Sequence, residues 1–91
     1  GLFPIYFSVS YNFIEILKLL IEYHTDVNTK DPKGETLIYP AIRNNNLKIV
    51  KLLVENGADL KIKVRRVNPI KFSQIERKGT ITKYLKSVLK E

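Results

Sequence analysis

Apolar positions recur with a helical period in the middle of the chain. Between residues 47 and 54 they fall at i, i+3, i+6 and i+7, which are Leu47, Val50, Leu53 and Val54. This spacing predicts one buried face of an α-helix. Ile49 and Leu52 widen that face, so we expect other elements to cover this helix on more than one side.

Polar and glycine residues predict where this helix begins and ends. Asn45 or Asn46 can cap its start, because a short amide side chain accepts hydrogen bonds from the free backbone N–H groups of the first turn. Gly57 can end it, because glycine adopts the left-handed conformation at little steric cost. The helix is therefore expected between these signals, over Leu47–Asn56.

The same pattern occurs earlier in the chain. The segment FIEILKLLIEYHTDVN aligns with NLKIVKLLVENGADLK, so that Ile16 falls over Ile49 and Glu22 over Glu55, 33 positions later. Internal self-similarity at this period, with two helices and a turn in each unit, predicts a stack of repeats. A repeat cannot bury its apolar face alone, so neighbouring units must cover one another.

The second unit resembles the ankyrin-repeat family. The family pattern is roughly D-x-x-G-x-T-P-L-H-x-A-A-x-x-G-x-x-x-I-V-x-L-L-L-x-x-G-A-D-V-N, and the segment here is DPKGETLIYPAIRNNNLKIVKLLVENGADLK. The retained positions are Asp31, Gly34, Thr36, Ala41, Ile49, Val50, Leu52, Leu53, Gly57, Ala58 and Asp59. The resemblance implies an all-α fold, an ankyrin-repeat solenoid of stacked helix-turn-helix units with projecting turns.

Several positions depart from the family pattern. Leu37 and Tyr39 replace its proline and histidine, so the hydrogen bonds that the histidine makes in the family do not carry over to this chain. Pro40 falls inside the first helix, where it is tolerated only in the first turn because it has no N–H. His24 replaces the terminating glycine of the first unit, and we expect it to end the helix there, since histidine is enriched at positive φ.

The alignment divides the chain into three units. They are an N-terminally incomplete ankyrin repeat over residues 1–28, a full repeat over 29–61 and a degenerate C-terminal capping repeat over 62–91. In the last unit Asn68 is expected to cap a short helix with Pro69 at its first position. A final helix starts at Thr80 or its neighbours and carries apolar residues at Ile81, Tyr84, Leu85, Val88 and Leu89. Its other face is polar, as the end of a solenoid requires.

The two ends of the chain differ in character. No charged residue precedes Glu15, and the sequence contains no methionine. A capping repeat should be polar on its outer side. We therefore expect the chain to be the C-terminal piece of a longer protein, with upstream ankyrin repeats in the same chain.

The net charge of +7 is concentrated in the last unit. Residues 1–60 carry six basic and seven acidic side chains, and residues 61–91 carry ten basic and two acidic ones. Three readings stay open: lysine that only solubilises the end of the stack, a surface for an acidic protein, and a surface for nucleic acid or anionic lipid.

The sequence offers little for catalysis or cofactors. It has no cysteine and one histidine, and Asp26 and Asp59 occupy equivalent turn positions of two units. These features predict no enzyme activity, no metal site and no cofactor. No uncharged run reaches the ~20 residues that a membrane helix needs. The lack of cysteine fits an intracellular location, in cytoplasm or nucleus.

The family resemblance implies a partner-binding surface on the turn tips and the exposed side of each first helix. The positions that match this surface are Phe7, Tyr11, Pro32, Lys33, Glu35, Pro40, Arg43, Asn44, Arg65, Arg66 and Phe72. We therefore expect a non-catalytic module that binds another protein on a concave surface. Two alternatives remain: docking on anionic surfaces through residues 61–78, and a purely structural cap. Phe7 and Tyr11 could instead pack against an upstream repeat, and Arg43 could be a solvated helix end.

Overall fold

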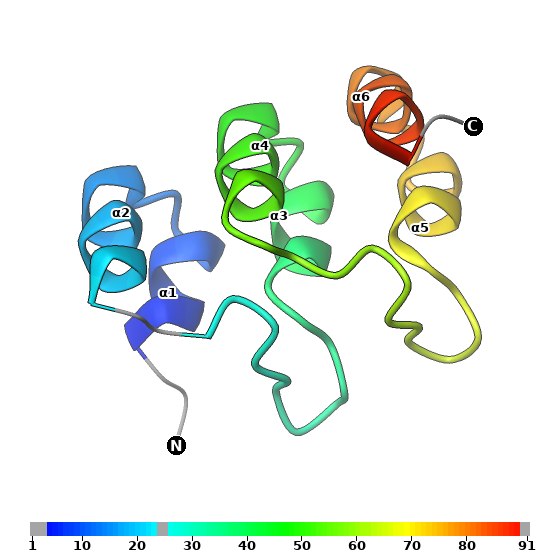
Figure 1. Cartoon of the computed structure of the whole chain (residues 1–91). Helices are drawn as coiled ribbons and strands as arrows, with labels where there is room; N and C mark the ends of the chain where they lie inside the picture. The colour runs from blue at the N-terminus through cyan, green and yellow to red at the C-terminus, as the bar shows by residue number, and fades with distance from the viewer. Residues whose placement is uncertain (1–3, 24–25, 90–91) are drawn as a thin grey trace.

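The computed structural model describes residues 4–23 and 26–89. These residues form six helices, which are α1 (Pro4–Ser10), α2 (Ile14–Glu22), α3 (Ile38–Arg43), α4 (Leu47–Glu55), α5 (Pro69–Ile75) and α6 (Gly79–Leu89). The helices are arranged as three pairs that stand side by side, and the loops between the pairs extend beyond the helices on one common side (Figure 1). The molecule measures 32 × 24 × 20 Å. This arrangement agrees with the expected all-α stack of helix pairs.

The helix ends lie where the local signals predict them. The Asn46 side chain accepts a hydrogen bond from the backbone N–H of Ile49 at 3.1 Å, which caps α4. Gly57 follows α4 with a φ of 94°, so glycine serves where a side chain would be strained. Asn68 caps α5 in the same way as Asn46 caps α4, with Pro69 at the first helical position. The helix-ending role expected of His24 falls outside the described residues.

Each helix pair turns its corner through one left-handed residue. These residues are Asn12, Asn45 and Arg77, with φ values of 63°, 55° and 58°. They occupy equivalent positions, two residues before the start of the second helix of each pair, where the family pattern has glycine. Asparagine tolerates this conformation better than most residues, whereas arginine has no such preference. The backbone geometry therefore repeats even where the residue type does not.

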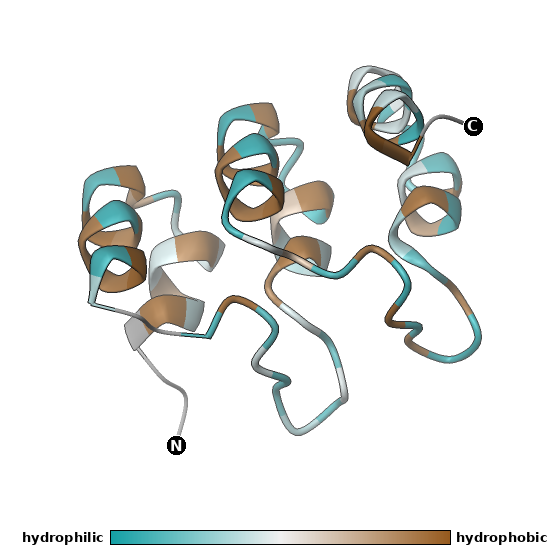
Figure 2. Cartoon of the chain, viewed as in Figure 1, coloured by the Kyte–Doolittle hydropathy of each residue, from teal (hydrophilic) through white to brown (hydrophobic). Residues whose placement is uncertain are grey.

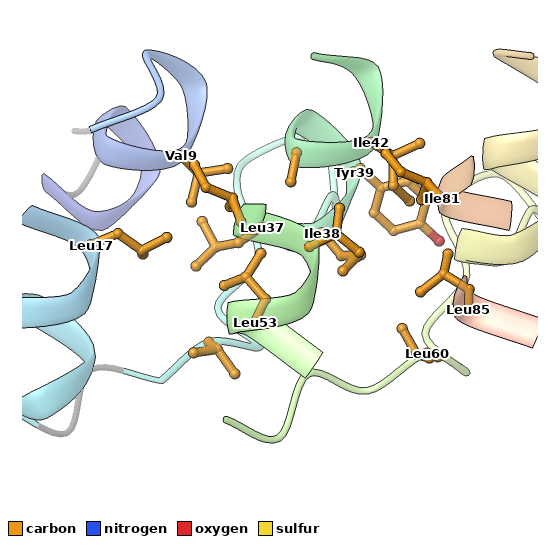
Figure 3. Packing of buried hydrophobic residues seen from close by; sticks show 14 of the residues in the cluster. Val9, Leu17, Leu37, Ile38, Tyr39, Ile42, Leu53, Leu60, Ile81 and Leu85 are labelled. Carbon is orange, nitrogen blue, oxygen red and sulfur yellow. The ribbon is translucent and has the colours of Figure 1, made fainter. Parts of the chain in front are cut away.

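One apolar core runs through all three pairs. Hydrophobic and hydrophilic positions alternate along α2 and α4, as Figure 2 shows. Figure 3 shows Val9 and Leu17 of the first pair, Leu53 of the second, and Ile81 and Leu85 of the third pointing into the shared interior. The central helix α4 buries Ile49, Val50 and Leu53. It is covered on two sides, as the width of its apolar face predicts.

The first pair is less covered than the second. Ile16 is 50% exposed, whereas Ile49, its equivalent on α4, is 0% exposed. Leu17 is the residue that α2 buries completely. The difference arises because a helix pair stands on both sides of α3–α4, and the described residues cover α1–α2 on one side.

Amide side chains join the first and second pairs on the surface. The Asn28 side chain donates to the carbonyl oxygen of Gly57 at 3.0 Å and accepts from the backbone N–H of Asp59 at 2.7 Å. The side chains of Asn46 and Asn12 hydrogen-bond at the opposite end of the helices. These bonds fix the rotation of one pair against the next, which apolar contacts alone leave less well defined.

Candidate functional site

A groove lies between α3 and α5, on the side where the inter-pair loops project. It has a volume of about 440 Å³. Its walls come from two turns and two helices, through Lys33, Glu35, Tyr39, Arg43, Val64, Arg65, Val67, Phe72, Ile75 and Glu76. Five of the residues predicted from the sequence therefore meet in one place: Lys33, Glu35, Arg43, Arg65 and Phe72.

Tyr39 connects the helices to the turn beyond them. Its side chain is 1% exposed, and its hydroxyl lies 2.7 Å from the carbonyl oxygen of Ile62 and 2.8 Å from that of Val67. The ring meets Phe72 edge-on, with centroids 5.2 Å apart. Burial raises the pKa of Tyr39 to about 12. Tyrosine thus supplies hydrogen bonds to the neighbouring turn at the position where the family has histidine.

Arg43 is held in place on the groove wall. Its Nη2 atom donates to Glu35 Oε2 at 2.7 Å, and its guanidinium carbon lies 5.5 Å from the centroid of the Phe72 ring. Both contacts favour one orientation of the side chain, because the carboxylate attracts it from one side and the aromatic face from another. The Arg43 side chain lines the groove and is 45% exposed, and its guanidinium has further N–H donors besides the one that Glu35 accepts.

A tight hairpin closes one end of the groove. Val64 and Val67 exchange two backbone hydrogen bonds of 2.9 Å. Between them Arg65 and Arg66 have φ values of 51° and 68°. Two consecutive positive φ values are the mark of a type I′ turn, which normally selects asparagine or glycine. The two arginine side chains therefore stand exposed at the tip of a backbone that disfavours them.

The turn before α3 is held by Asp31. Its Oδ1 atom accepts the backbone N–H groups of Lys33 and Glu35, each at 2.9 Å. Its Oδ2 atom accepts from the hydroxyl of Tyr6 at 3.0 Å. Burial, together with this hydrogen bond to a carboxylate, raises the pKa of Tyr6 to about 12. Pro32 and Lys33 are exposed at the tip of this turn, as predicted. The hydrogen bond from Tyr6 of α1 to Asp31 helps to hold the backbone of the turn in place.

Three predicted surface residues lie away from the groove but remain on the surface. Phe7 and Tyr11 stack on one another on the first pair, with ring centroids 6.1 Å apart. The Asn44 side chain donates to the carbonyl oxygen of Ser10 at 2.9 Å, so it links α3 to the end of α1. The sequence pattern placed these residues on one surface with Arg43, and none of the three is among the residues that line the groove.

The prediction was wrong for Pro40, which is buried. It lies in the first turn of α3, where a missing N–H breaks no helical hydrogen bond, as the sequence indicates. Its side chain faces the interior because the neighbouring helix pairs enclose α3, whose residues from Ile38 to Ile42 are all buried. Pro40 therefore supports the fold and offers no surface for a partner.

Sequence reasoning missed Val64 and Val67 as groove residues. Their role depends on the hairpin, which brings two residues of one loop against Tyr39. The symmetric run V-R-R-V was the available signal, since two apolar residues around a two-residue turn indicate a hairpin. The turn contains neither asparagine nor glycine, the residues that normally indicate such a hairpin, so the sequence analysis did not predict it.

The described residues give no sign of a metal centre or a membrane span. In residues 4–23 and 26–89 no three histidine, aspartate or glutamate side chains are grouped so that they could hold a metal ion. Within the same part of the chain, no helix has the length and apolar character to cross a bilayer.

A comparison with protein-family models agrees with the helix-pair geometry. The model described as ankyrin repeats (3 copies) matches residues 1–64, which are 64 of the 91 residues of the chain. No curated protein sequence matches the chain. Ankyrin repeats are generally protein–protein interaction modules. The internal period, the three stacked helix pairs and this match together show that the chain belongs to the ankyrin-repeat family.

Proposed function

We propose that this protein is a non-catalytic module that binds another protein through the groove between α3 and α5. The observation that supports this most is the ordered Arg43, which Glu35 holds at 2.7 Å beside the ring of Phe72. Arginine and aromatic residues dominate binding energy at protein interfaces. A side chain that is already ordered also loses less conformational entropy when a partner arrives.

The groove favours a particular kind of partner segment. Ile75 is exposed and apolar, and it stands on the same wall as Phe72. An apolar side chain of the partner can cover both residues and exclude water from them. The free N–H donors of Arg43 then suit a carboxylate or a backbone carbonyl of the same segment. The volume of about 440 Å³ suits a few side chains rather than a whole helix.

The test compares groove variants with a matched surface variant. The tagged chain captures proteins from a cell lysate of the source organism at physiological salt, with nuclease present. Arg43→Ala and Ile75→Ser change the groove, while Lys48→Ala removes an exposed cation on α4 outside it. We expect one captured protein to be lost with both groove variants and retained with Lys48→Ala. Thermal unfolding of each variant shows that the fold is intact.

The proposal is refuted if a specific protein is captured equally by the native chain and by both groove variants. Capture that occurs only when nuclease is omitted would likewise move the function away from the groove and toward nucleic acid. Because Arg43 and Ile75 are both exposed, neither change is expected to unfold the chain.

We also propose that a further repeat of the same kind packs on the outer face of α1 and α2. Phe7 and Ile16 are exposed there, whereas the equivalent Pro40 and Ile49 are buried where the first pair covers the second. A consensus ankyrin repeat fused before residue 1 should then raise the unfolding temperature. An unchanged unfolding temperature, with Ile16 still accessible to solvent, would contradict this packing.

A further inference from the structure

A second hollow lies at the corner where α5 turns into α6. It has a volume of about 500 Å³. Its lining includes four basic side chains and two hydroxyls, from Arg77, Lys78, Lys83, Lys86, Ser73 and Thr82. We call these six residues the basic hollow. It shares no residue with the groove between α3 and α5.

The basic hollow is on the outer side of the last helix pair. Ile81 and Leu85 point from α6 into the common core (Figure 3). Lys83 and Lys86 of the same helix point away from this core and are exposed, whereas Thr82 lies at the flank and contacts Ser73 of α5. At the shift of 32 that equates Asn45 with Arg77, the equivalents of Thr82 and Lys86 in the second pair are the apolar Val50 and Val54, which are buried and half-buried. The last pair has a hydroxyl and a cation at these positions, and the side chains of Arg77, Lys83 and Lys86 are exposed.

The charges of the basic hollow are all positive. No carboxylate is among the residues that line it, and within the described part of the chain none of its four basic side chains is joined to a carboxylate. A polar end of a solenoid needs charge, but it does not need charge of one sign. Four cations around one concavity repel each other and concentrate a positive potential there, which an anionic partner relieves.

The hydroxyls of the hollow are already engaged. Ser73 Oγ and Thr82 Oγ1 lie 2.6 Å apart, and Ser73 also lies 2.6 Å from the carbonyl oxygen of Ile70. These contacts fix the floor and tie α5 to α6. The attraction for a ligand therefore comes from the Arg and Lys side chains, which are long enough to adapt to several anionic groups.

Arg77 occupies its position at a cost to the fold. Its φ of 58° is left-handed, and the equivalent residues of the first two pairs, Asn12 and Asn45, are of a type that tolerates this conformation. An arginine there disfavours folding relative to glycine, yet it adds a cation at the mouth of the hollow. The backbone conformation at this position does not favour arginine, whereas the added charge would favour an anionic ligand.

The lining also indicates the chemistry of the ligand. It contains no aromatic side chain on which a nucleic-acid base could stack and no large apolar residue that could enter a bilayer. The four basic side chains suit a segment that carries several carboxylates, which an acidic stretch of a protein supplies.

We propose that the basic hollow binds an acidic, extended segment of a partner protein. Its site is separate from the groove, so either proposal can fail without the other.

Titration calorimetry on the full chain tests this with a peptide of about ten residues that alternates glutamate and glycine. A peptide with glutamine in place of glutamate is the uncharged control. Lys83→Glu/Lys86→Glu reverses the charge of the hollow, and Lys61→Glu/Lys63→Glu makes the same change of net charge outside it. We expect the hollow variant to raise Kd by at least about tenfold and the control variant to raise it by less than about threefold.

Arg77→Gly is a second variant, and we expect it to weaken binding without destabilising the fold. It removes a cation and relieves the left-handed strain, so it should weaken peptide binding while raising the unfolding temperature.

Three results would overturn the proposal. The peptide binds no more tightly than its glutamine control, or both double variants weaken binding equally, which indicates diffuse charge. Alternatively, a DNA duplex or phosphatidylserine vesicles bind the native chain but not the Lys83→Glu/Lys86→Glu variant, while the peptide binds neither. That last result would assign the hollow to phosphate groups of nucleic acid or lipid.

Discussion

Removal of the Tyr39 hydroxyl tests the link between the helices and the hairpin. In Tyr39→Phe the ring stays in place against Phe72, and only the oxygen is lost. That oxygen lies 2.7 Å from the carbonyl of Ile62 and 2.8 Å from the carbonyl of Val67. The variant therefore isolates the hydrogen bonds that tyrosine makes here, with little change in packing volume.

The loss of stability in Tyr39→Phe depends on which hydrogen bonds the carbonyl oxygens of Ile62 and Val67 keep. The Val67 oxygen still accepts the backbone N–H of Val64 at 2.9 Å, so it remains satisfied. The Ile62 oxygen loses a partner in a half-buried setting. One lost neutral hydrogen bond with one weakened acceptor costs about 1–2 kcal/mol of unfolding free energy. For a domain of this size that lowers the unfolding temperature by about 4–16 °C.

The effect should depend on pH at the alkaline end. Burial raises the pKa of Tyr39 to about 12 from its ordinary value of 10. The folded protein holds this proton more tightly than the unfolded chain. The contribution of protonated Tyr39 to the free energy of unfolding is therefore complete below pH 10 and is lost as pH rises toward 12. The stability difference between the native chain and Tyr39→Phe should therefore shrink over that interval. Tyr6 titrates in the same range in both proteins, so its contribution cancels.

Urea unfolding followed by far-UV circular dichroism measures these free energies at neutral pH and at several alkaline values. Tyr23→Phe is the matched control, because Tyr23 is 76% exposed and loses the same atom from a solvated ring. We expect the control to change stability by less than about 0.5 kcal/mol. Equal stability of Tyr39→Phe and Tyr23→Phe at neutral pH would refute the view that the hydroxyl holds the hairpin.

Three further predictions concern the corners, the core and the inter-pair contacts. Arg77→Gly should raise the free energy of unfolding by about 0.5–1 kcal/mol in urea titration, whereas Arg77→Ala, which keeps a Cβ atom, should gain much less. Leu53→Ala should lower the free energy of unfolding by about 2–5 kcal/mol because Leu53 is fully buried. Leu19→Ala, at a half-exposed position, should lower it far less, and equal losses for the two variants would contradict the burial of Leu53 in the core. Asn28→Ala should cost about 1–2 kcal/mol through the loss of two hydrogen bonds between pairs, and an unchanged urea midpoint would show that these bonds are not formed in solution.

Much of the fold follows from local sequence signals. The apolar period of α4, its Asn46 cap and the stop at Gly57 all depend on residues a few positions apart, and a helix is itself built from such contacts. Asn68 and Pro69 set the start of α5 in the same way. The 33-residue self-similarity then indicates stacking, because equal units with apolar faces bury those faces against each other.

The candidate site was only partly accessible to the same reasoning. The family resemblance placed Glu35, Arg43 and Phe72 on one surface, and the structure brings them together. It could not indicate that Pro40 faces inward, since the side of a short helix that its neighbours cover depends on the rotation of whole helix pairs. That rotation is set by contacts between residues far apart, such as the side chain of Asn28 with the backbone of Gly57.

The sequence by itself therefore determined the helices, their caps and the repeat, since these depend on interactions within one or two turns of the chain. Only the tertiary structure decided which side chains share a groove. Tyr39 meets the carbonyls of Ile62 and Val67 across 23 and 28 residues of chain, and the basic hollow forms where two helices pack at a corner. Contacts over such separations depend on how complete helix pairs fit together, which a local pattern of residue types does not encode.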